Sequence, residues 1–381
     1  MASLIVERVL VPAEGTHRAI AERAFGLVGE RANAVRRFHN SVSGLLYGSI
    51  RAVTSVASAT IGVAAAAVAG SHPYQPVTST RRGSAAVSAI NGLWGDELSR
   101  RGNDLQIEMA FRDRAGAPIA ISEVSLKETF PDATARLAVF IHGLVETERC
   151  WGDDDSLGES LASVGGFSEL RLRYNSGLPI ADNGKALAAL LEEVSSAWPV
   201  EIEEIVLVGH SMGGLVARSA AHAGAALPWI NTLAHIVTIG TPHMGAPLEK
   251  ATHALTRALR LLPESRPIAA FLDDRSRGIK DLRYGTLVTT GLDGVGGETS
   301  GAVRIPAHTR HHFVAGTVTD DPSHPMGFLI GDLVVRTASG TGRGRNRVVA
   351  PTNAEVFGGR NHLSLTTDPE VHRLVAMWLS G

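Results

Sequence analysis

The sequence predicts a doubly wound α/β fold with a mostly parallel sheet. Beyond residue 100, short and nearly continuous apolar runs alternate with longer amphipathic stretches. Strands that are covered by helices on both faces have this appearance. The composition, 44% hydrophobic and 19% charged, supports a full core, and 41 glycines suit a fold with short loops and close backbone approaches.

Five apolar runs are expected to form strands, with helices between them and at the end of the sheet. The strands are Leu137 to Ile141, Leu170 to Tyr174, Ile205 to Val208, Ile236 to Ile239 and Phe313 to Val318; the helices are Ala181 to Ala197, Met212 to Ala223 and Pro369 to Leu379. Ahead of them, alternating apolar residues from Leu105 to Ile121, interrupted by a turn at Arg114 to Pro118, predict an antiparallel hairpin.

Residues 1–85 are expected to form an N-terminal helical module with a linker, and residues 86–381 the α/β domain. Apolar residues recur at helical spacing from Ala13 to Ile50. The stretch from Ala52 to Gly70 has no charge, but its Ala, Ser and Gly content favours packing on this protein or a second copy over a membrane span. Homo-oligomerisation and peripheral membrane contact through these helices are both open.

Charge and cysteine content exclude several classes of protein. With 36 basic and 38 acidic residues the net charge is −2, so nucleic acid is not an expected partner. The single cysteine, Cys150, cannot form an internal disulfide or a thiolate metal site by itself. Glu7 and Arg8 interrupt the only early apolar run, so we expect a cytoplasmic protein, membrane-associated if the N-terminal helices dock on lipid.

A nucleophile motif lies between one predicted strand and the helix that follows it. The segment Gly209-His210-Ser211-Met212-Gly213-Gly214 contains Gly-x-Ser-x-Gly. A serine on a sharp strand-to-helix turn needs small neighbours, because strand and helix approach closely there. This context predicts that Ser211 is a nucleophile; an ordinary helix N-cap serine would not need the glycine spacing.

A serine hydroxyl needs a base, and a base of this kind needs a carboxylate to orient it. His362 lies in a loop before the C-terminal helix and is the expected base, whereas His372 lies within that helix. Asp332, 30 residues before His362, is the expected acid, with Asp320 and Asp321 as alternatives.

Two backbone N–H groups are expected to form the oxyanion hole. One belongs to Met212, directly after the nucleophile, and the other to Leu144, in the His142-Gly143-Leu144 loop after a predicted strand. His142 is expected to support this loop by hydrogen bonding.

These segments together resemble the α/β-hydrolase superfamily. The resemblance rests on Phe140 to Leu144, Gly209 to Gly214, Gly240-Thr241-Pro242-His243 and Gly331 to Val335, and it covers about Ala117 to Gly381. Within the superfamily the segments are similar to His-Gly-motif lipases and esterases and to inositol-deacylase-like hydrolases. The resemblance implies the same nucleophile, acid, base and oxyanion donors. One departure is Leu333, where the family usually has glycine.

An insertion at about 245–305 is expected to be a helical cap over the nucleophile, with packing on the side of the sheet as the alternative. A nearby interval is rich in possible metal ligands, but their spacing matches no ligand pattern, and we expect neither a metal nor a cofactor. These residues are His308, His311, His312, Asp320, Asp321 and His324.

The sequence therefore predicts a serine hydrolase that cleaves lipid-like or short acyl esters through an acyl-enzyme. Acyl transfer or glycolipid deacylation by the same triad is an alternative. So is a non-catalytic membrane or assembly protein that uses the N-terminal helices.

Overall fold

A computed structural model gives the structure of the chain. It describes residues 80–245, 276–284, 286–289, 297–299, 303, 305–324, 331–344 and 348–380, together with isolated positions before residue 80. The chain divides into two compact units, Met1–Ile90 and Asn91–Gly381. The amphipathic stretch from Ala13 to Ile50 is described only at isolated positions, and the uncharged stretch from Ala52 to Gly70 lies outside the described residues. The expected domain limits therefore remain predictions.

The larger unit contains a seven-stranded sheet in its described part, with the order β1-β3-β2-β4-β5-β8-β9. All neighbouring strands are parallel except β1, which pairs antiparallel with β3. The fold is thus the predicted mostly parallel α/β sheet. The strands are β1 (Ala110–Arg112), β2 (Arg136–Ile141), β3 (Phe167–Arg173), β4 (Glu204–His210), β5 (Leu233–Ile239), β8 (Arg310–Gly316) and β9 (Asn353–Phe357).

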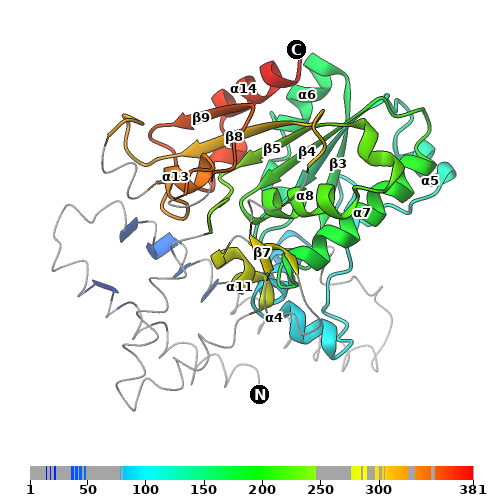
Figure 1. Ribbon diagram of the computed structural model, residues 1–381. Helices are drawn as coiled ribbons and strands as arrows, with labels where there is room; N and C mark the ends of the chain where they lie inside the picture. The colour runs from blue at the N-terminus through cyan, green and yellow to red at the C-terminus, as the bar shows by residue number, and fades with distance from the viewer. Residues whose placement is uncertain are drawn as a thin grey trace, which may run out of the picture. The chain divides into compact units, whose positions relative to one another are not determined.

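Helices cover both faces of this sheet (Figure 1). On one face lie α7 (Ile180–Ala197) and α8 (Met212–Ala223), and on the other lie α6 (Leu157–Gly165) and α14 (Pro369–Leu379). Further helices are α4 (Arg81–Arg100), α5 (Glu123–Thr129), α11 (Arg277–Tyr284) and α13 (Thr337–Gly340), with 3-10 turns at Glu148–Trp151, Pro228–Thr232 and Ser364–Thr367.

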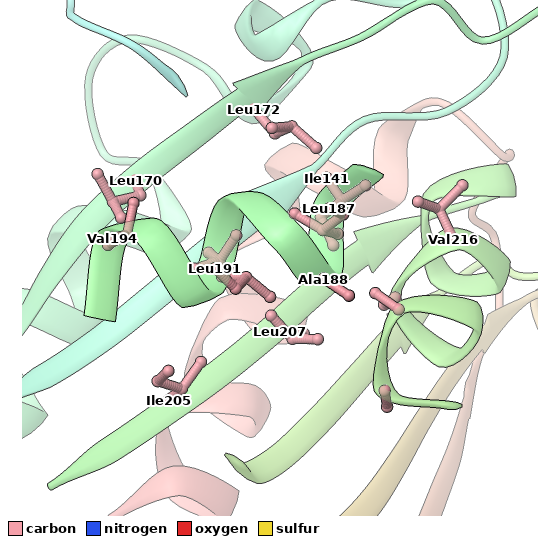
Figure 2. Close-up of a cluster of buried hydrophobic side chains, with 14 of the residues drawn as sticks. Ile141, Leu170, Leu172, Leu187, Ala188, Leu191, Val194, Ile205, Leu207 and Val216 are labelled. Atoms are coloured by element: carbon pink, nitrogen blue, oxygen red, sulfur yellow. The ribbon is translucent and has the colours of Figure 1, made fainter. Parts of the chain in front are cut away.

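The apolar runs of the central strands are continuous because successive side chains enter two different cores. In β2, Val139 and Ile141 pack toward α7 and α8, while Ala138 and Phe140 pack toward α6 and α14. Figure 2 shows the first core, where leucine and valine side chains of α7 lie between β3, β4 and α8. Each fully buried aliphatic side chain contributes about 1.5–3 kcal/mol, so these two layers fix the sheet on which the loops of the site are carried.

Helix starts are set by local capping. Ser156 accepts a hydrogen bond from the Glu159 N–H at the start of α6, and Asp368 accepts from the Glu370 and Val371 N–H groups at the start of α14. α14 also has proline at its first position, where no N–H is needed. The Asp368 cap starts α14 one 3-10 turn after His362.

The expected hairpin before β2 is present but short. Its returning arm contributes one bridge, between Arg112 and Pro118. Residues 105–107 do not form a strand, because the Asn91 side chain accepts from the Ile107 N–H and donates to the Leu105 carbonyl. A side-chain amide therefore takes the place of a neighbouring strand.

The edge strand β9 was not expected from the sequence. Ala354 and Glu355 are exposed and no β9 residue is fully buried, so the strand lacks the apolar run by which the others were found. A continuous apolar run is needed only where both faces of a strand are covered, and the side chains of β9 are exposed or half-buried. β9 matters for the site, since His362 follows it by five residues.

The described parts of the 245–305 insertion come from its second half. β6 (Thr286–Thr289) and β7 (Gly297–Thr299) form an antiparallel pair, and Leu287 is buried in the core beside α7 and α8. In α11, Asp281 accepts a hydrogen bond from the Ile180 N–H at the start of α7. The expected helix from Leu248 to Leu262 lies outside the described residues, so the cap remains a prediction.

No helix in the described part of the chain has both the length and the apolar composition that crossing a bilayer requires.

A chain of buried polar groups crosses four strands under α14. Asn353 donates to His312 Nδ1 (3.1 Å), so His312 Nε2 carries the proton and donates to His235 Nδ1 (2.8 Å). The other nitrogen of His235 faces Glu204 at 3.6 Å, and the Trp378 ring stacks on His312. Burial and the neighbouring His235 lower the pKa of His312 to about 4. The native state therefore holds this histidine neutral.

This arrangement predicts a loss of stability in mild acid. In the unfolded chain His312 binds a proton near pH 6.5, but the folded protein does not until about pH 4, so stability is lost as the pH falls through that window. We expect the urea midpoint of unfolding to fall between about pH 7 and about pH 4.5, and to fall less in His312→Gln. His324→Gln, at an exposed loop position, is the control and should behave as the wild type. An equal fall in His312→Gln would contradict the assignment.

Candidate active site

Ser211 occupies a sharp turn between β4 and α8. Its backbone has φ 52° and ψ −120°, and its N–H donates to the Ile239 carbonyl at 2.8 Å. A positive φ costs a residue with a side chain about 1–3 kcal/mol, and such strain is concentrated at functional sites. The serine is therefore held in the strained conformation that its glycine spacing predicted.

The glycines around Ser211 are required by close backbone contacts. A Cβ on Gly209 would lie 2.4 Å from the Gly214 nitrogen, and one on Gly213 would lie 2.1 Å from the Ile141 carbonyl oxygen. A Cβ on Gly214 would meet Thr241 Oγ1 at 2.1 Å. No side chain fits at these positions, so helix α8 can start directly against β2 and β5.

His362 and Asp332 form a buried pair. His362 Nδ1 lies 2.8 Å from Asp332 Oδ2, and the two residues are 5% and 1% exposed. Since the carboxylate accepts, Nδ1 carries the proton and Nε2 is the basic nitrogen; no described residue hydrogen-bonds to Nε2. The His362 ring packs on Gly240. The residue before it, Ile239, accepts the hydrogen bond from the Ser211 N–H. The three predicted residues therefore lie together at the carboxyl-terminal ends of the parallel strands.

The loop around Asp332 fixes its carboxylate. Asp332 Oδ1 accepts from the Val334 and Val335 N–H groups, at 3.0 and 2.7 Å, which leaves Oδ2 for His362. Leu333 has φ 82°, in the left-handed region that favours glycine. The leucine that departs from the family pattern thus keeps the backbone conformation that a glycine would adopt easily.

The two alternative acids lie elsewhere. Asp321 is exposed and its carboxylate binds the N–H and hydroxyl of Ser323. The Asp320 carboxylate lies near Gly359. Neither of these two carboxylates is bonded to His362 among the described contacts. His372 is hydrogen-bonded to the Thr366 carbonyl within the C-terminal segment.

The loop after β2 lies directly over Ser211. A Cβ on Gly143 would be 3.0 Å from the Ser211 Cβ, so a glycine is needed for this approach. Within the described structure, the Leu144 N–H donates to no acceptor. Met212 is the first residue of α8, where the N–H has no partner inside the helix. Both predicted oxyanion donors are therefore available.

His142 supports the loop, as expected. Its Nδ1 donates to the Gly143 carbonyl (2.8 Å), and its Nε2 accepts from the Tyr174 N–H (3.4 Å). The Tyr174 ring stacks on the imidazole and its hydroxyl donates to the His142 carbonyl. Burial lowers the pKa of His142, consistent with a neutral ring in this role.

Sequence reasoning missed two residues of the site, Glu146 and His210. Glu146 Oε2 accepts from the Gly143 N–H (2.7 Å) and from His210 Nδ1 (2.8 Å). The sequence contains one indirect signal, because Glu146 follows β2 and His210 ends β4, and these two strands prove to be adjacent. Using that signal requires the order of the strands, which the sequence alone does not provide.

Two of the histidines outside this site have structural partners. His308 contacts the Ile230 carbonyl, and His312 belongs to the buried chain across the sheet. Within the described ranges, no three His, Cys, Asp or Glu side chains converge as metal ligands.

Comparison with known proteins gives one family match and several structural likenesses. Residues 180–269 match the sequence profile of the PGAP1-like alpha/beta domain. No curated protein matches the sequence. The mature lipase of Bacillus licheniformis is 20% identical, with a TM-score of 0.43 over 64% of this chain and 91% of that one.

Two further solved structures are similar. A metagenomic carboxyl esterase is 14% identical, with a TM-score of 0.39 over 83% of this chain and 98% of that one. The monoacylglycerol lipase of Paleococcus ferrophilus is 18% identical, with a TM-score of 0.37 over 64% of this chain and 93% of that one. The PGAP1-like match, the sheet order and the strained serine between β4 and α8 together support the assignment of this fold to the α/β-hydrolase superfamily.

Proposed function

We propose that the protein is a serine hydrolase that cleaves carboxylic esters through an acyl-enzyme. The observation that supports this most strongly is the buried His362–Asp332 pair, which leaves His362 Nε2 as an acceptor. The pair and the strained Ser211 lie at the same ends of the parallel strands. A base oriented by a carboxylate beside a strained serine is the arrangement that nucleophilic acyl transfer requires.

In the proposed reaction, Ser211 Oγ attacks the ester carbonyl carbon while His362 Nε2 takes the hydroxyl proton. The N–H groups of Leu144 and Met212 stabilise the negative charge on the carbonyl oxygen. When the C–O bond breaks, His362 returns the proton to the leaving alcohol. Water then attacks the acyl-serine with the same base, releasing the carboxylic acid and restoring Ser211.

Asp332 holds His362 in the tautomer that this reaction needs and stabilises the imidazolium that forms. It is suited to this because its other oxygen is fixed by two backbone N–H groups. An asparagine there could present an N–H in place of the acceptor and favour the wrong tautomer.

Substitution of the three residues tests the proposal. With p-nitrophenyl butyrate we expect kcat to fall at least about 10⁴-fold in Ser211→Ala and His362→Gln, and about 10⁴-fold in Asp332→Asn. His372→Asn, a buried histidine of the same C-terminal segment, is the matched control and should retain activity. Reaction with a fluorophosphonate should modify the wild type and not Ser211→Ala. A folded Ser211→Ala variant with wild-type activity would refute the proposal.

The substrate is proposed to be a lipid-like or short acyl ester. Acyl transfer to an alcohol and deacylation of a glycolipid would use the same groups, so product analysis must separate the three reactions. We expect free acid as the main product when about 10% glycerol or methanol is added as a competing acceptor, because water completes the proposed cycle. A new ester as the main product would identify a transferase instead.

A further inference from the structure

Glu146 joins two loops of the site. Its side chain is 15% exposed, and Oε2 accepts hydrogen bonds from the Gly143 N–H and from His210 Nδ1. Burial by itself would raise the pKa of Glu146, but His210 and the Gly143 N–H lower it to about 2. The group is therefore a carboxylate, and it accepts hydrogen bonds from the loop after β2 and from the end of β4.

His210 extends this connection to a third loop. Its Nε2 lies 3.2 Å from the His362 carbonyl oxygen, and the two imidazole rings are 4.8 Å apart between centroids. Both nitrogens of His210 thus face oxygen acceptors, and only an imidazolium has two N–H groups to donate. Burial opposes this charge, but Glu146, the His362 carbonyl and Asp332 together raise the pKa of His210.

The loop that Glu146 holds is strained. Val145 has φ 58°, which is unfavourable for a β-branched residue, and its N–H donates to Ser176 Oγ (3.1 Å). A strained loop keeps its shape only where neighbouring contacts determine it. The charged hydrogen bond from Gly143 to Glu146 is such a contact, and it lies next to the proposed oxyanion donor Leu144.

We propose that Glu146 and His210 form a charged pair that positions the oxyanion loop and the His362 loop relative to Ser211. The inference rests on the proposed ester hydrolysis. Both are positioning residues: Glu146 acts through the backbone of Gly143, and His210 acts through the backbone of His362. The pair links the segment after β2, the end of β4 and the segment after β9, which are distant in sequence.

A double-mutant cycle tests the pair. We expect Glu146→Gln and His210→Gln each to lower kcat about 10- to 100-fold with KM changed less than about 3-fold, because the oxyanion donor is displaced in the transition state. The loss in the double variant should be clearly smaller than the product of the two single losses, since both substitutions remove the shared Glu146–His210 contact. The rate of fluorophosphonate labelling of Ser211 should fall in parallel with kcat.

Glu148→Gln is the matched control. Glu148 lies two residues further along and forms a buried ion pair with Arg173; among the described contacts its carboxylate is not hydrogen-bonded to Gly143, His210 or Ser211. This substitution should lower the melting temperature while kcat stays within about 3-fold of the wild type. If Glu148→Gln lowers kcat as much as Glu146→Gln, general destabilisation explains both results and the positioning role is overturned. Wild-type kcat in the single variants, or additive losses in the double variant, would also overturn it.

A measurement on the wild-type protein does not depend on the variants folding. We expect the ¹⁵N chemical shifts of His210 at about pH 7 to show both ring nitrogens protonated. A neutral His210 at that pH would refute the charged pair. Failure of the proposed function is distinguishable, because it would appear as activity in Ser211→Ala.

Discussion

The turn between β4 and α8 is the constraint on which the site depends. The helix starts so close to the sheet that three glycines are needed, and the serine between them takes a positive φ. The strain of about 1–3 kcal/mol is small beside the apolar burial on both faces of the sheet, so the fold can maintain it. Leu144, Asp332 and His362 lie in loops that follow the carboxyl ends of β2, β8 and β9 in the same sheet.

Two histidine–carboxylate pairs lie side by side at these strand ends and differ in the partner of the second ring nitrogen. His362 has one nitrogen bonded to Asp332 and the other left as an acceptor, so it can take up a proton. His210 has an oxygen acceptor at each nitrogen, which stabilises the charged ring. The same side chain is thus suited to proton transfer in one position and to holding loops in the other. The difference is set by what the second nitrogen contacts.

Most of the central sheet could be predicted, because strands buried on both faces leave a continuous apolar run. All five expected strands are present. β9 could not be predicted in this way, since it is an edge strand with exposed Ala354 and Glu355. The arm around Leu105 was expected to be a strand, but the side chain of Asn91 satisfies its backbone instead. A side-chain contact of this kind leaves no periodic signal.

The gathering of Ser211, Asp332 and His362 was predictable from motif and chain order, because each had a local context that could be recognised. The choice among three aspartates required coordinates, since it depends on how the loop after β8 folds back. The Glu146–His210 contact was even harder to predict from the sequence. It joins residues 64 positions apart, and neither residue belongs to a pattern that specifies a partner.

The late position of β9 affects how the protein is made. Ser211 and the loop over it are synthesised long before β9, which is the last strand of the described sheet in sequence and precedes His362 by five residues. A nascent chain that already has its central strands therefore lacks its base. On the proposed chemistry, such a partly folded chain cannot hydrolyse an ester. It becomes active only after β9 has paired with β8 and His362 has reached the site.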